Sequence, residues 1–212
     1  MKATILNLLL GSFVAIMTVG FDDQKPGVVP DGWTAAHTGK GTEKWTVEKD
    51  ATAPSAPMVL KQSGVCSFST CVKDDTSLVD GFAEVKFKPL SGKVDESGGL
   101  VWRYQDPKNY YVVRANALED NVVLYKMENG KRSSLPIVGR KGGYGVKAKV
   151  AKDKWQTLRV EFVGDTFAVT FEGKELFKVK DTTFTKAGKV GLWTKADSET
   201  LFDDFTYGKK KD

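Results

Sequence analysis

Hydrophobic and polar residues alternate along most of the chain. The segments 82–88, 158–162 and 167–171 each place apolar residues at every second position, with mostly charged or polar residues between them. Successive side chains of a strand point to opposite faces, so this period of two is typical of strands buried on one side. No window of ten or more residues has the spacing of an amphipathic helix.

Residues that favour tight turns separate these strands at short intervals, at 106–109, 128–131, 164–165 and 172–174. About a dozen strands joined by hairpins predict an all-β fold of two antiparallel sheets. The segment 22–62 is less regular because it contains four prolines. We expect it to contribute opening strands around Trp33 and Trp45 within the same domain.

The composition fits one globular domain. The chain has 212 residues, of which 41% are hydrophobic and 28% are charged. A chain of this size buries a substantial core, which excludes a disordered tail or a disulfide-dense mini-protein. The net charge of +5 is spread along the sequence, and the only tight basic run is 209–211. This distribution argues against a nucleic-acid-binding module.

The first twenty residues predict a signal peptide. Lys2 is followed by eighteen uncharged residues, with small residues near Thr18 and Gly20. The alternative is an uncleaved membrane anchor, since eighteen residues approach the length that spans a bilayer. Asn7 in the apolar run and the lack of a stop-transfer cluster favour the signal peptide. We therefore expect residues 21–212 to form one exported domain, periplasmic or extracellular, without stable membrane insertion.

The two cysteines, Cys66 and Cys71, would pair in an oxidising compartment. An extended strand would hold their α-carbons roughly 17 Å apart, whereas a disulfide needs about 5.5 Å. A disulfide therefore predicts a turn or bulge at 67–70, and the alternative is two free thiols.

The strands 99–105 and 110–116 form the most informative predicted hairpin. Pairing Gln105 with Tyr110 sets Trp102 opposite Val113 and gives the two faces different chemistry. One face is apolar and suits the core, with Leu100, Trp102, Tyr104, Tyr111, Val113 and Ala115.

The opposite face of this hairpin is polar. It carries Arg103, Gln105, Tyr110, Arg114 and Asn116. Guanidinium and amide groups hydrogen-bond sugar hydroxyls, and an aromatic ring stacks on a sugar ring. Trp193 and Lys195 join this face if their strand has matching parity; with the opposite parity, Trp193 lies in the core. The alternative for the whole face is a solvated sheet surface.

The chain resembles the concanavalin A-like, laminin-G-like jelly rolls of exported bacterial proteins, including the 3-keto-disaccharide hydrolase domain family. The resemblance is carried by GGLVWRYQDPKNYYVVRAN, by KWQTLRVEFVGDTFAVTFEGKELFKV and by AGKVGLWTKADSETLFDDFTY. It implies a β-sandwich jelly roll of two antiparallel sheets. Function is less defined, because this fold hosts lectins, glycosidases, lyases and adhesion modules.

Catalytic motifs are sparse. Glucanases of this fold use an E-x-D-x(x)-E strand, but 48–50 supplies only two acids and no third follows. His37 is the only histidine, and its surroundings predict a solvent-exposed loop. For a 3-keto-glycoside hydrolase or lyase, the resemblance implies acid–base chemistry near C2, with a metal ion assisting. No motif assigns catalytic residues.

Four acids predict a structural calcium site at the joined termini. These are Asp22, Asp23, Asp203 and Asp204. Calcium prefers oxygen ligands, and similar folds frequently hold this ion there. The alternative is ordinary exposed acids that protect a sheet edge. No other cofactor is indicated.

The sequence therefore favours an exported jelly roll that binds carbohydrate or another hydroxyl-rich small molecule without catalysis. One alternative is a hydrolase or lyase of 3-keto-glycosides. The other is a scaffold or adhesion domain whose partner is a protein.

Overall fold

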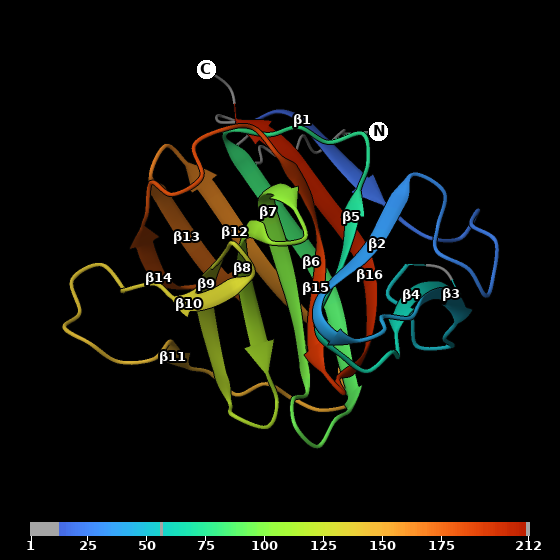
Figure 1. Cartoon of the computed structure of the whole chain (residues 1–212). Coiled ribbons are helices and arrows are strands. Elements are labelled where there is room, and N and C mark those ends of the chain that lie inside the picture. The colour runs from blue at the N-terminus through green and yellow to red at the C-terminus, as the bar shows by residue number, and fades with distance from the viewer. Residues whose placement is uncertain (1–12, 56, 211–212) are drawn as a thin grey trace, which may run out of the picture.

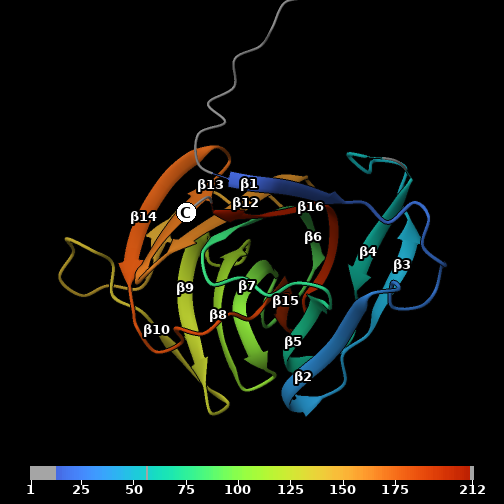
Figure 2. The same cartoon turned by 90° about the horizontal axis from the view of Figure 1, so that it is seen from above.

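The computed structural model describes residues 13–55 and 57–210, and within these ranges it contains strands and no helix. The strands form two antiparallel sheets that lie against each other (Figures 1 and 2). The prediction of an antiparallel sandwich is confirmed.

The back sheet of Figure 1 contains, in order, β14 (Lys174–Lys180), β13 (Thr166–Phe171), β12 (Gln156–Val163), β6 (Gly81–Ser91), β16 (Glu199–Lys210), β4 (Met58–Gln62) and β3 (Trp45–Lys49), with β1 (Phe13–Val19) beside β16. The front sheet contains β10 (Lys131–Ser134), β9 (Asn121–Glu128), β8 (Asn109–Asn116), β7 (Ser97–Asp106), β15 (Lys189–Ala196), β5 (Cys66–Lys73) and β2 (Trp33–Gly41), with β11 (Val146–Lys147) beside β9.

The core fills the space between the sheets. Trp102 of the front sheet lies 5.3 Å from Phe167 and 6.1 Å from Phe162 of the back sheet, measured between ring centroids. On β6, Ala83, Val85 and Phe87 are fully buried. The alternating pattern thus identified the inward face of this strand correctly. Burial of such apolar side chains is the dominant favourable contribution to the free energy of folding.

The β7–β8 hairpin differs from its predicted register. Trp102 pairs with Tyr111 rather than with Val113, because the register shifts between Trp102 and the turn. Arg103 has a left-handed φ of 45°, which is uncommon for a residue other than glycine. The shift reverses the alternation, so Tyr104 lies on the outer face of the front sheet instead of in the core.

The front sheet carries a second apolar layer on its outer face. Its members are Val72, Val101, Tyr104, Tyr110, Val112, Val123, Tyr125, Met127 and Trp193. They are buried because the sheet curls around them. At its upper end the β9–β10 turn reaches the β7–β8 turn, where Gly130 N donates to Lys108 O at 3.0 Å. We call this curled outer surface the concave face.

The second half of the predicted signal peptide forms β1. It pairs antiparallel with β16 from Val19 opposite Phe205 to Phe13 opposite Lys210. Ile16 and Met17 remain about half exposed. Residues 1–12 lie outside the described residues, so the peptide as a whole stays a prediction. In the described ranges, no helix has the length and apolar character needed to cross a membrane.

The structure does not show the predicted disulfide between Cys66 and Cys71. Cys66 and Cys71 are both free and buried on the continuous strand β5. Burial raises the pKa of both thiols. His37 also differs from its prediction, because it lies on β2 and pairs with Glu43 instead of occupying an exposed loop.

Candidate functional site

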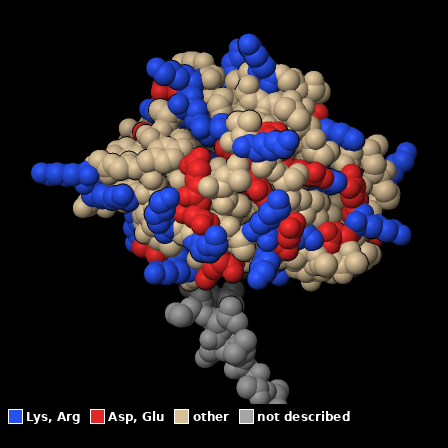
Figure 3. All heavy atoms as spheres, turned by 90° about the horizontal axis from the view of Figure 1, so that it is seen from below, with Lys and Arg blue, Asp and Glu red and all other residues tan. Residues whose placement is uncertain are grey.

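Charged and aromatic side chains converge on the lower part of the concave face. We call this group the concave-face cluster, and it consists of Asp95, Arg114, Glu119, Tyr125, Arg132, Tyr144 and Lys195. The β6–β7 and β8–β9 loops turn at the same lower end of the sandwich. Figure 3 views that end, where acidic and basic side chains are interspersed over the surface.

Arg114 on β8 is the buried centre of the cluster, with 1% of its surface exposed. Its Nη2 donates to Glu119 Oε2 at 3.0 Å and to the Tyr144 hydroxyl at 3.1 Å. Burial opposes its charge, but Tyr125, Asp95 and Glu119 outweigh burial and raise the pKa of Arg114. The cluster therefore holds a permanent cation.

Glu119 faces Arg114 from the β8–β9 turn. Burial alone would raise the pKa of its carboxyl, but hydrogen bonds from Asn121 and Arg114 lower it overall. Glu119 is thus ionised at neutral pH. Its side chain is 41% exposed, so this carboxylate is accessible to a ligand.

Asp95 is completely buried, and Lys195 donates to its Oδ2 at 3.0 Å. Its Oδ1 has no hydrogen-bond donor among the described residues. The loop that carries Asp95 is fixed by Asp197, whose carboxylate accepts hydrogen bonds from the backbone N–H groups of residues 93–95. The ion pair with Lys195 offsets part of the cost of burying this carboxylate.

The ring of Tyr125 contacts the guanidinium groups of two arginines. The guanidinium carbon of Arg114 lies 5.9 Å from its ring centroid, and that of Arg132 lies 4.3 Å away. The Tyr125 hydroxyl bonds to that of Tyr144, and burial raises the pKa of Tyr125. Arg132 also lies over Trp193, at 5.7 Å. Within the described residues it forms no ion pair, and its buried Nη1 has no acceptor.

Five of the predicted contact residues belong to this surface. Arg114 and Lys195 lie in the cluster itself. Asn116 accepts from the backbone of Leu118 and shapes the β8–β9 turn. Trp193 lies on the concave face, where its Nε1 donates to the Tyr110 hydroxyl at 3.3 Å. Trp193 and Tyr110 are fully buried, so they form the floor beneath the cluster.

Arg103 does not lie on the predicted face. Because its backbone is left-handed, its guanidinium turns inward at the upper end of the sandwich. There it donates to the carbonyls of Val79 at 2.9 Å, Phe184 at 2.8 Å and Gly164 at 2.6 Å. Arg103 therefore joins backbone segments, and its predicted place among the ligand contacts is corrected.

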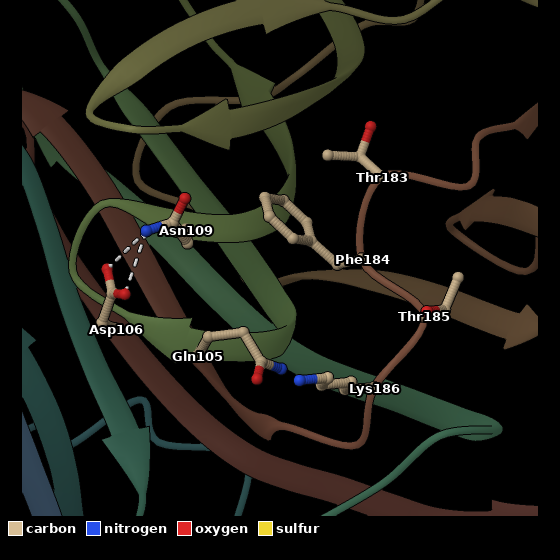
Figure 4. Close-up of a pocket in the computed structure, with 7 residues that line it drawn as sticks. All are labelled: Gln105, Asp106, Asn109, Thr183, Phe184, Thr185 and Lys186. Carbon is tan, nitrogen blue, oxygen red and sulfur yellow. Dashed lines mark hydrogen bonds between the residues drawn. The ribbon is translucent and has the colours of Figure 1, made fainter.

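Gln105 also lies at the upper end, where it lines a pocket of about 310 Å³. Figure 4 shows the residues around this pocket, which are Gln105, Asp106, Asn109, Thr183, Phe184, Thr185 and Lys186. They come from the adjoining ends of β7 and β8 and from the segment between β14 and β15. The sequence-predicted residues thus divide between two places on the molecule.

The four acids of the predicted calcium site make separate contacts. Asp203 is buried, accepts from Ser55 N at 3.0 Å, and has a pKa raised by burial. Asp204 pairs with Lys86 at 2.7 Å, and Asp22 accepts from Met58 N. Asp23 is exposed. In the described part of the chain, no three acidic, histidine or cysteine side chains group as metal ligands. The calcium prediction gains no support.

The model of the 3-keto-alpha-glucoside-1,2-lyase-like domain matches residues 18–206. The chain belongs to this family. No curated protein matches the sequence.

Solved structures place the fold of this family member among the concanavalin A-like jelly rolls, as the resemblance implied. The carbohydrate binding module CBM66 from Bacillus subtilis is similar over 85% of this chain and 96% of its own, with a TM-score of 0.64 and 22% identity. The cellulose induced protein Cip1 covers 91% of this chain and 96% of its own, with a TM-score of 0.63 and 12% identity. A Bacillus licheniformis beta-glucanase is similar over 92% of this chain and 98% of its own, with a TM-score of 0.57 and 13% identity.

Sequence reasoning missed most of the cluster outside the hairpin. Asp95 and Tyr144 lie in loops, and Arg132 lies on a four-residue strand whose inward direction follows from the curl of the sheet. Glu119 could have been predicted from the sequence, because it follows Asn116 by three residues and belongs to the same turn.

Proposed function

We propose that the concave-face cluster binds a carbohydrate. The observation that carries this proposal is the pairing of a buried cation with an accessible anion, Arg114 with Glu119, beside a buried carboxylate paired with Lys195. Charged groups held in this way present donors and acceptors in fixed directions, as recognition of several hydroxyls requires.

The exposure of the cluster supports a ligand of moderate size. Tyr144 is 47% exposed, and the side chains of Glu119 and Lys195 are 41% and 25% exposed. These groups offer a phenol, a carboxylate and an ammonium above a buried aromatic floor. Sugar hydroxyls can bond to the polar groups while a sugar ring contacts the phenol ring. The similar structures named as a carbohydrate binding module and a beta-glucanase support a sugar as the ligand.

Calorimetric titration of the full chain with maltose, cellobiose and sucrose tests this proposal. We expect Glu119→Gln to weaken binding at least tenfold, because it removes a charged acceptor but keeps the side-chain shape. Glu175→Gln is the matched control, since Glu175 is an exposed glutamate on β14 in the other sheet. Absence of binding by the unmodified chain, or equal affinity for both variants, would contradict the proposal.

A second candidate is a 1,2-lyase acting on 3-keto-α-glucosides, favoured by the family to which the chain belongs. A ketone at C3 acidifies the proton on C2. A base removes this proton, the C1–O bond breaks, and the departing oxygen takes a proton from an acid. The products are an alcohol and a 3-keto sugar with a C1–C2 double bond. The accessible Glu119 carboxylate is the candidate base, although the hydrogen bonds that lower its pKa also weaken it as a base, and the Lys195 ammonium is a source of the proton.

A p-nitrophenyl 3-keto-α-glucoside distinguishes the two candidates. Lyase activity would release p-nitrophenol and an unsaturated ketone that absorbs in the ultraviolet, and Glu119→Gln would stop both. Saturable binding of this compound without formation of product would exclude the lyase and support only the binding function.

We also propose that residues 1–20 direct export and are then removed. The apolar run after Lys2 and the start of the family match at residue 18 support this proposal. N-terminal sequencing of protein from the periplasm and medium tests it, and a chain that still begins at Met1 would contradict it.

A further inference from the structure

The pocket of Figure 4 lies away from the concave-face cluster. Asn109 at the pocket and Arg114 in the cluster stand five residues apart on β8, which corresponds to about 17 Å along an extended strand. A disaccharide is shorter than this separation. The pocket is therefore a second place on the molecule, and nothing in the proposed function uses it.

The frame of the pocket is fixed by the buried side chains of Arg103 and Tyr111 and by the exposed side chain of Gln105. Arg103 holds the carbonyl of Phe184, and the Tyr111 hydroxyl accepts from the backbone N–H of Phe184 at 3.0 Å. The same hydroxyl donates to Asp181 at 2.6 Å, while Gln105 Nε2 donates to Ala187 O at 2.9 Å. The segment 181–187 is thus tied to the front sheet at both ends and at its centre. A site held in this way needs little rearrangement to bind a ligand.

The ring of Phe184 stands between the β7–β8 turn and the polar residues of its own segment (Figure 4). It packs edge-on against Tyr111, with ring centroids 5.1 Å apart, and is partly buried. An aromatic ring held from one side leaves its remaining surface to a ligand. The apolar face of a pyranose ring is a suitable partner for such a surface.

Polar groups around Phe184 remain available. Within the described residues, the Lys186 ammonium forms no ion pair and the Thr185 hydroxyl no hydrogen bond, and both residues are exposed. Asp106 is different, because Asn109 Nδ2 and the backbone of Lys108 already occupy its carboxylate. The free groups are therefore one cation and one hydroxyl beside a partly buried ring.

From this arrangement we propose that the pocket is a second carbohydrate subsite, which takes one pyranose ring. The ring lies against Phe184, and its hydroxyls bond to Thr185 and Lys186. A volume of about 310 Å³ accommodates one such ring with water around it. A chain with two subsites at opposite ends of one sheet gains affinity for long or clustered glycans over short ones.

Nuclear magnetic resonance of the labelled full chain, titrated with methyl α-glucoside, maltose and sodium glucuronate, tests this proposal. We expect saturable shifts in the amides of residues 105–109 and 183–186. Lys186→Met should reduce the affinity at these amides at least threefold, and Phe184→Leu should reduce it at least tenfold. Lys174→Met is the matched control, because Lys174 is an exposed lysine at the far end of β14. It should bind like the unmodified chain.

The two subsites are separated by a second variant. Glu119→Gln should weaken the shifts around residues 114–125 and leave those at the pocket intact. The second subsite is overturned if the pocket amides do not shift with any of the three sugars, or if Lys186→Met and Phe184→Leu titrate like Lys174→Met. Those results would leave sugar binding at the concave-face cluster unaffected.

Discussion

Arg132 of β10 lies over Phe68 of β5, with its guanidinium carbon 5.1 Å from the ring centroid. Four strands separate β10 from β5 in the front sheet. A flat sheet would hold two strands at this interval about 24 Å apart. The contact therefore measures how far the sheet curls, and the curl brings residues of distant strands into one cluster.

Arg132→Ala is expected to lower the free energy of unfolding. The guanidinium contacts Phe68, Tyr125 and Trp193, and cation–π contacts of partly buried groups contribute about 1–2 kcal/mol in total. Arg132→Lys should restore less than half, because an ammonium lacks the planar face that stacks on a ring. Urea unfolding measures both. Lys131→Ala, at the exposed neighbouring position, should leave the unfolding midpoint unchanged, and an equal effect there would refute the role of the contact.

Arg103→Met should destabilise the upper end of the sandwich by about 3 kcal/mol, because it removes the hydrogen bonds that the buried guanidinium donates to three backbone carbonyls, each worth about 1 kcal/mol. These are the carbonyls of Val79, Gly164 and Phe184. Hydrogen exchange should accelerate in residues 181–187 more than in β12. Uniform acceleration over both segments would show that Arg103 does not hold this segment in particular.

Asp197 should make the free energy of unfolding depend on pH in the acidic range. Burial alone would raise the pKa of its carboxyl, but the N–H groups of residues 93–95 lower it overall. A carboxyl whose pKa is lowered in the folded state stabilises the fold at pH values above its ordinary pKa of 3.8. This stabilisation is lost as the pH falls through the pKa of the folded state. Asp197→Asn should flatten the decline in stability between about pH 5 and pH 3, as followed by urea unfolding. Asp23→Asn, at an exposed position, should keep the original slope.

Both thiols should resist modification in the folded protein. Cys71 is completely buried in the core, and Cys66 is 3% exposed. Burial raises the pKa of each thiol, so the reactive thiolate is scarce at neutral pH. A colorimetric thiol reagent should react slowly with the native chain and detect two thiols in urea. Detection of none in urea would show that the cysteines are paired.

The strands and their inward faces could be predicted because alternation records which side chains meet the core. Ala83, Val85 and Phe87 illustrate this, and the hairpin parity is also correct from Leu100 to Trp102. The prediction fails at Arg103. A left-handed backbone at an arginine carries no signal in the sequence, and the inversion moves Arg103 and Tyr104 to opposite faces from those expected.

The candidate site was only partly predictable for a related reason. Arg114 follows from strand parity, which is local, whereas the sequence left the parity of Lys195 open and the structure places it on the concave face with Trp193. Asp95 and Arg132 join them through loop paths and sheet curvature, which depend on the whole fold. A polar residue in a turn shows no periodicity, so its spatial partners become visible only in three dimensions.

Because β1 pairs with β16, removal of residues 1–20 on export would change one edge of the back sheet. β1 covers one edge of β16 from Phe205 to Lys210. Cleavage after residue 20 would uncover that edge, and uncovered edges promote association between copies. Lys209 and Lys210 at its end would repel a second copy carrying the same charges. In the precursor β1 would thus cover this edge, and in the processed chain only the charges of Lys209 and Lys210 would oppose pairing with a second copy.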